Sequence, residues 1–109
     1  MTGSGNLQVD GAATNYKSFD AAATTSIDFS LSNLAYTTAT PGTFTFTNMK
    51  DGGTYTLVTK SNTVGTLDPS QAGLNFKSTT NGPTTVNKHT VYTFMVFGTD
   101  VYYYMTTGF

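Results

Sequence analysis

The sequence predicts an all-β protein, a small antiparallel β-sandwich of the jelly-roll kind. Polar and apolar residues alternate with a period of two in several segments, as side chains do when they leave a pleated strand on opposite faces. Glu and Arg, which favour helices, are absent, so every acidic residue is Asp and every basic residue other than one His is Lys. About a fifth of the chain is Thr, which together with Tyr, Phe and Val suits a half-buried pleated surface.

The composition limits the classes of function. A length of 109 residues predicts a single domain at residues 6–109, preceded at residues 1–5 by a flexible linker or an expression remnant. The net charge of -1 argues against a nucleic-acid partner, because phosphate binding needs clustered Lys and Arg. The apolar runs are far shorter than the roughly 20 residues that span a bilayer, so we expect no membrane insertion. Without Cys, disulfides and thiolate metal sites are excluded.

Short strands are predicted in the first third of the chain. Residues 6–19 are weakly patterned, with one short strand expected around residues 7–9. Residues 34–40 predict a further weak strand that ends at a Pro-Gly pair. Residues 26–31 alternate cleanly and predict a strand whose apolar side chains point inward, namely Ile27, Phe29 and Leu31.

The segment from Thr43 to Lys60 has the strongest pattern. Two alternating stretches, TFTFT and TYTLV, flank a turn that contains Asp-Gly-Gly. Gly accepts a positive φ without a Cβ clash, and Asp can bond the backbone ahead of it. The sequence therefore predicts a β-hairpin here.

The next part of the chain is rich in turns. Residues 61–73 predict a connection, and Leu74 and Phe76 mark another short strand. Residues 77–88 form a polar loop of about a dozen residues, which is long for a compact domain. A long loop on a rigid scaffold favours a binding or interface role.

The C-terminal segment predicts an antiparallel hairpin that is apolar on both faces. Its strands are expected at residues 89–97 and 101–107, joined by a tight turn at Gly98, Thr99 and Asp100. A strand that is apolar on both faces is usually covered on both, and in so small a domain a second subunit can supply one cover. We therefore expect a homo-oligomer with a candidate subunit interface at Tyr92, Phe94, Tyr102 and Tyr104. The alternative is that the core and a covering loop share the two faces.

Five short motifs, in this order along the chain, resemble a β-rich module of bacteriophage fibre proteins. They are TSIDFS at residues 25–30, TFTF at 43–46, GGTYTLV at 52–58, VYTF at 91–94 and FGTDVYY at 97–103. The chain departs from the family pattern between residues 64 and 85, where the family has a segment containing Pro and Trp, because it has no Trp. The resemblance implies a trimeric β-sandwich of a tail or head fibre, on the virion surface, that attaches to a host surface glycan or protein and contacts other virion proteins.

The expected receptor contacts lie in the turn at residues 48–53 and in the polar loop at residues 77–88. The candidate contact residues in them are Asn48, Lys50, Asp51, Asn81, Thr84 and Asn87. Two alternative functions stay open: a structural virion decoration or fibre-shaft domain without a ligand, and a carbohydrate-binding module. The tyrosines at 102–104 would suit sugar stacking, but subunit or core packing explains them as well.

No enzyme, cofactor or metal site is predicted. His89 is the sole histidine, and nothing in the sequence pairs it with a carboxylate or Ser as a triad would. A calcium site would need several converging oxygens, and the spacing of Asp20, Asp28 and Asp68 does not indicate one. A glycosidase would need two facing carboxylates, and no pair is marked out.

Overall fold

The computed structural model describes residues 10–12 and 14–109. The predicted linker at residues 1–5 and the predicted strand around residues 7–9 lie outside this part. The described residues form strands and no helix, so none of them belongs to a helix that could cross a membrane. The strands are β1 Phe19–Asp20, β2 Ser26–Asp28, β3 Leu34–Thr37, β4 Thr43–Thr47, β5 Thr54–Thr59, β6 Asp68–Ser70, β7 Asn75–Lys77, β8 Thr90–Phe97 and β9 Asp100–Thr107.

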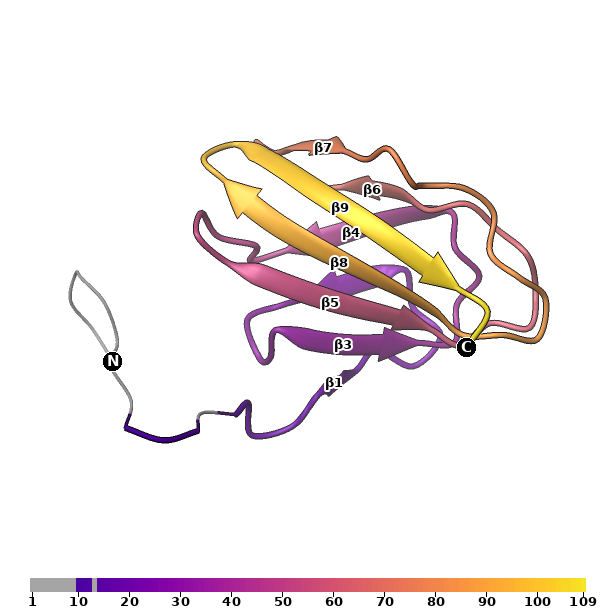
Figure 1. Ribbon diagram of the computed structural model, residues 1–109, viewed down its shortest axis with the longest axis horizontal. Helices are drawn as coiled ribbons and strands as arrows, with labels where there is room; N and C mark the ends of the chain where they lie inside the picture. Colours follow the sequence, from indigo (N-terminus) through magenta and orange to yellow (C-terminus); the bar gives the residue numbers. More distant parts are fainter. Residues whose placement is uncertain (1–9, 13) are drawn as a thin grey trace.

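The strands form two sheets, and the chain winds between them (Figure 1). The larger sheet has the order β1-β3-β5-β8-β9-β7, and the smaller has the order β2-β4-β6. From β1 to β6 the chain alternates between the sheets, and each strand pairs in parallel with the strand two places earlier. Phe19 thus lies beside Ala35, and Ala35 beside Leu57. This winding is that of a β-solenoid.

The expectation of an antiparallel jelly-roll sandwich was therefore wrong in topology, although the all-β class is confirmed. The predicted hairpin from Thr43 to Lys60 was also wrong, because β4 and β5 belong to different sheets. Between them the chain crosses the molecule with Asn48 at φ 66° and Met49 buried. The Gln71 side chain accepts from the Met49 N–H and donates to its carbonyl, at 3.1 Å each, which fixes this crossing.

The C-terminal hairpin is confirmed. Strands β8 and β9 pair antiparallel over their full length, from Thr90 with Thr107 to Phe97 with Asp100. Strand β8 also pairs antiparallel with β5, so the hairpin extends the parallel coils. On the far side of the hairpin, β7 pairs in parallel with β9.

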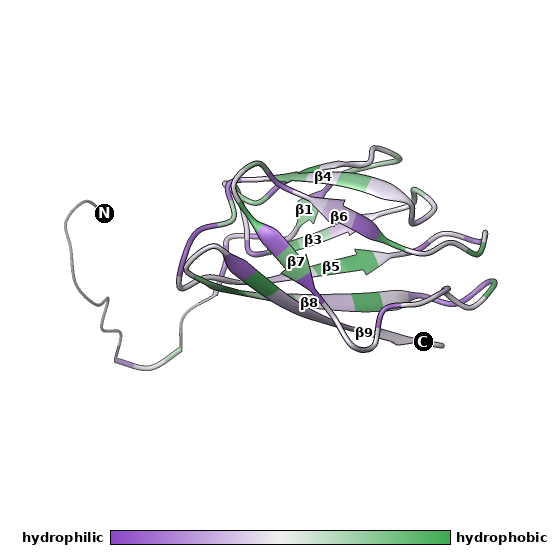
Figure 2. Ribbon diagram, turned by 90° about the horizontal axis from the view of Figure 1, so that it is seen from above, coloured by the Kyte–Doolittle hydropathy of each residue, from purple (hydrophilic) through white to green (hydrophobic). Residues whose placement is uncertain are grey.

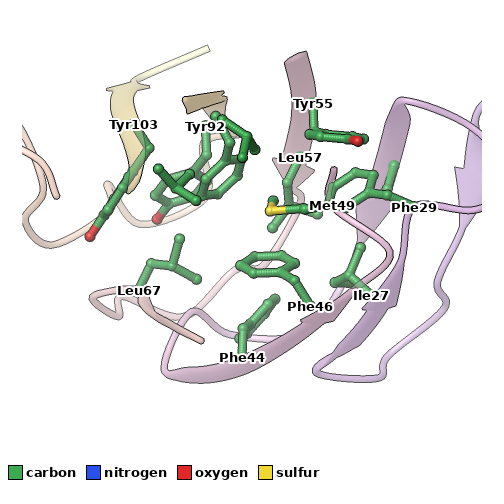
Figure 3. Packing of buried hydrophobic residues seen from close by; sticks show 14 of the residues in the cluster. Ile27, Phe29, Phe44, Phe46, Met49, Tyr55, Leu57, Leu67, Tyr92 and Tyr103 are labelled. Atoms are coloured by element: carbon green, nitrogen blue, oxygen red, sulfur yellow. The ribbon is translucent and has the colours of Figure 1, made fainter. Parts of the chain in front are cut away.

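Aromatic and aliphatic side chains fill the space between the sheets (Figure 3). Phe46 on β4 lies 5.1 Å from Phe94 on β8, measured between ring centroids, so these two rings join the sheets. Ile27 and Phe29 are buried as predicted, whereas Leu31, three residues past the end of β2, is 70% exposed. The edge strands β6 and β7 carry hydrophilic segments, while β4, β5 and β8 carry hydrophobic bands (Figure 2).

Candidate functional site

The outer face of β9 carries two exposed tyrosines. Alternation along the strand directs Val101 and Tyr103 into the core and leaves Tyr102 and Tyr104 outside. Tyr102 is 40% exposed and Tyr104 is 50% exposed. The two are separated by two strand rises, or about 6.8 Å along the strand. They therefore form an aromatic pair on one face of the larger sheet.

Strand pairing shows which neighbours share this outer face. Tyr102 lies beside Lys77 on β7 and beside Met95 on β8. Tyr104 lies beside Thr93 on β8. Residues paired in a ladder point to the same side of a sheet, so the odd-numbered residues of β8 and the even-numbered residues of β9 face outward together.

The expected grouping of Phe94 with Tyr102 and Tyr104 on one face was therefore wrong. Phe94 pairs with Tyr103, and both point into the core. Tyr92 is likewise fully buried within the single chain. Of the four predicted interface residues, only Tyr102 and Tyr104 lie on the surface.

A groove of about 190 Å³ runs beside the two tyrosines. Lys77, Ser78 and Thr79 form its polar wall, where the chain leaves the edge strand β7. The Lys77 ammonium lies 3.3 Å from a carboxylate oxygen of Asp100, and both side chains are accessible to solvent. Ser78 Oγ accepts the N–H of Thr80 at 3.2 Å, which leaves its own hydroxyl proton free to donate. The groove thus combines aromatic faces with hydrogen-bonding groups of both kinds.

The apolar character of this face extends beyond the groove. Phe97 is 62% exposed, and its ring meets that of Tyr102 edge to face with the centroids 5.9 Å apart. Half-buried Met95, Val91 and Val58 continue the outer face across β8 and β5. These apolar residues, with Thr54, Thr93 and Thr106 between them, are called the outer apolar face of the larger sheet.

The predicted receptor-contact turns lie at opposite ends of the molecule (Figure 1). Asp51 accepts the N–H of Gly98 at 2.8 Å, so its turn packs beside the β8–β9 turn. Asn48 and Lys50 in the same turn are exposed. Residues 77–88 lead away to the other end, where β8 begins.

In the second turn, the three predicted residues have different surroundings. Thr84 is only 8% exposed, and its hydroxyl accepts the N–H of Gly65 at 3.1 Å, so this side chain holds two loops together and is not free to contact a receptor. Asn81 donates to the Leu67 carbonyl at 2.9 Å. Asn87 is exposed, at φ 59°. The six residues therefore do not form one site.

The smaller sheet carries one titratable group with a shifted pKa. The Asn48 side-chain amide donates to Asp28 at 2.7 Å, and the N–H of Ser30 donates to the same oxygen at 2.8 Å. These hydrogen bonds, with that of Asn48 first, lower the pKa of Asp28. Asp28 lies beside Thr47 and Asp68 beside Thr43, so the two carboxylates sit at opposite ends of β4.

Residues 10–12 and 14–109 offer little support for metal binding or for a role of His89. This part of the chain holds no group of three or more His, Cys, Asp or Glu that could bind a metal ion. His89 is exposed, and its backbone N–H and carbonyl both pair with Phe109.

A second groove, of about 530 Å³, lies along the edge strand β1. Its wall includes the highly exposed Tyr16 and Leu31, together with Tyr36. The sequence did not reveal it, because residues 6–19 are weakly patterned. The Lys77–Asp100 pair was missed as well, because a parallel pairing of β7 with β9 leaves no local signal in the sequence.

Comparisons with protein-family models, with curated proteins and with solved structures found no match to this chain.

Proposed function

We propose that this chain is an attachment module of a bacteriophage fibre, displayed on the virion, and that it binds a host surface glycan or protein through the groove beside Tyr102 and Tyr104. The order of the fibre-like motifs in the sequence supports the virion assignment. These motifs fall on β2, β4, β5 and the β8–β9 hairpin, which together line the core and carry the groove.

One observation carries the binding role: an exposed aromatic pair stands directly beside a polar groove. A ligand site needs apolar contact surface together with a few placed hydrogen-bonding groups. Tyr102 and Tyr104 offer the first, and Lys77, Ser78 and Thr79 offer the second. Tyr102 and Tyr104 are exposed, whereas Val101 and Tyr103 on the same strand are buried.

Weak single contacts suffice for attachment when several copies act together. Linked sites raise the effective concentration for each later contact, so avidity exceeds single-site affinity by orders of magnitude. A homotrimer, as in the fibre modules that the sequence resembles, would present three grooves. Trimer formation is part of this proposal.

A second candidate function uses the same face for packing alone. The outer apolar face of the larger sheet would then contact another copy or another virion protein in a decoration or shaft domain. The 25 residues of β5, β7, β8 and β9, at about 3.4 Å each along strands about 4.8 Å apart, give roughly 400 Å² of flat face. Stable interfaces bury about 800 Å² on each partner, so packing through this face alone would be weak. For this reason we favour the attachment function over the structural one.

Direct binding to cells tests the proposal. Host bacteria incubated with the purified, fluorescently labelled chain should bind it saturably, and preincubation with unlabelled chain should reduce adsorption of the phage. The variant Tyr102→Ala should bind less, whereas Tyr16→Ala, which removes a 95% exposed tyrosine elsewhere, should bind as wild type does. Unchanged adsorption at saturating protein would count against an attachment role. Sedimentation analysis separates the trimer from a monomeric carbohydrate-binding module.

A further inference from the structure

We propose that the groove beside Tyr102 and Tyr104 binds one neutral pyranose ring, held by an adjacent pair of hydroxyl groups. This inference rests on the proposed attachment function and names the ligand class of the same site. The groove volume of about 190 Å³ decides the size of the ligand. Pockets that enclose a drug-sized molecule have about 300–1,000 Å³, so this one takes a single ring and leaves the rest of a glycan in solvent.

The aromatic pair sets the orientation of the ring. One face of a pyranose is a patch of C–H groups, which carries a slight positive charge, whereas the face of an aromatic ring is negative. Stacking the C–H patch on Tyr102 therefore removes apolar surface from water and matches the charges. The edge-to-face contact with Phe97 supports the Tyr102 ring from the side away from the groove.

The polar wall fits two neighbouring hydroxyl groups. Lys77 lies directly beside Tyr102 in the ladder, and its ammonium is 3.3 Å from the Asp100 carboxylate. One sugar hydroxyl can accept from Lys77, whose charge Asp100 balances from outside the groove, while the neighbouring hydroxyl accepts the free proton of Ser78.

The charge balance selects a neutral sugar. Lys77 is the charged residue of the polar wall, and Asp100, 3.3 Å from it outside the groove, balances its charge, so the site has no net formal charge. A carboxylated sugar in the same pose would place its negative group next to Asp100, and its attraction to Lys77 would compete with the existing ion pair. Acidic sugars are thus disfavoured relative to neutral hexoses.

Nuclear magnetic resonance titration of the full chain tests this inference. The probes are the methyl pyranosides of glucose, galactose and mannose, with N-acetylneuraminic acid as the acidic comparison. At least one neutral probe should shift the amide signals of residues 77–79 and 102–104 and bind at least tenfold more tightly than the acidic probe. Tyr102→Ala should weaken that binding at least tenfold, and Tyr16→Ala should leave it unchanged.

The outcomes separate this inference from the attachment function. Tighter binding of the acidic probe, equal binding by Tyr102→Ala and wild type, or no binding of any neutral probe would overturn the sugar assignment, even where the chain still binds host cells. Neutral-sugar binding at the groove, without binding to host cells, would uphold the sugar assignment and overturn the attachment function.

Discussion

Phe94 and Tyr103 face each other across the β8–β9 ladder, with their ring centroids 5.4 Å apart and the rings stacked at 28°. The register of this pair determines on which face the other side chains of the hairpin lie. Because side chains alternate, the pairing of Phe94 with Tyr103 sends Tyr102 and Tyr104 outward together. A register shifted by one residue would bury these tyrosines and remove the groove.

Replacing Phe94 by Ala should lower the free energy of unfolding by about 3–5 kcal/mol, because it removes a fully buried ring and leaves a cavity. Phe97, three residues further along the same strand, is the matched control. It is 62% exposed, so Phe97→Ala should change stability by less than about 1 kcal/mol. Urea unfolding of both variants gives the comparison. Equal losses would show that the two faces of β8 are not distinct.

Replacing Tyr92 by Phe should raise the free energy of unfolding by about 1 kcal/mol. The Tyr92 hydroxyl is buried and has no hydrogen-bond partner among the described residues, so removing it removes a desolvation cost. Tyr55→Phe is the opposite case, because the Tyr55 hydroxyl accepts the N–H of Lys50 at 2.8 Å. That variant should lose about 1 kcal/mol in the same urea experiment.

Alkaline pH provides an independent readout for Tyr92. Burial raises the pKa of Tyr92 to about 12, above the usual value near 10 of an unfolded tyrosine. The raised pKa makes a contribution to the free energy of unfolding that is fully present below about pH 10 and is lost as the pH rises towards the folded pKa. Unfolding measured between about pH 9 and 11 should therefore depend less steeply on pH in Tyr92→Phe than in wild type. An identical slope would contradict the burial of this hydroxyl.

Stability should also fall in acid because of Asp28. Hydrogen bonds from Asn48 and Ser30 hold the pKa of Asp28 below its unfolded value. A lowered pKa gives stability that is present above the unfolded value, near 3.9, and is lost as the pH falls through the folded value. Asp28→Asn should flatten this acid loss in unfolding curves recorded between about pH 6 and 2.5. Asn48→Ala, which removes the largest cause of the shift, should flatten it in part.

Replacing Gly65 by Ala should lower the free energy of unfolding by about 1–3 kcal/mol, as overpacking does. A Cβ there would collide with the Pro41 carbonyl oxygen and approach the Thr40 methyl group at 2.9 Å. Gly82→Ala is the control, since a Cβ at Gly82 meets nothing within 4 Å. Thermal unfolding should leave the control within a few degrees of wild type.

The sequence predicted the positions of the strands better than it predicted which strands pair with each other. Alternation over Thr43–Thr47 and Thr54–Thr59 located β4 and β5 correctly, because a pleated strand has the same period in any sheet. The partner of a strand depends on distant residues. Phe44 pairs with Pro69 and Leu57 pairs with both Ala35 and Tyr92, and no local pattern records these pairings. For this reason the sequence predicted a hairpin where the chain crosses from β4 in one sheet to β5 in the other.

The candidate site was predictable in part for the same reason. The apolar C-terminal hairpin and its turn follow from local residues, so Tyr102 and Tyr104 were among the four expected subunit-interface residues. Which residues of β8 join them depends on the register that the turn sets, and that register placed Phe94 in the core. The polar wall depends on β7 lying beside β9, a pairing between segments far apart in the sequence.

The position of Pro69 limits how copies of this chain can aggregate. Strand β6 is one of the two edges of the smaller sheet, and the N–H of Asp68 donates towards β4, to the Gly42 carbonyl. Alternation therefore turns the nitrogen of Pro69 towards the free edge, where a proline has no hydrogen to offer an incoming strand. An incoming strand would therefore lack one backbone hydrogen bond at this edge, which disfavours fibril-like growth from β6.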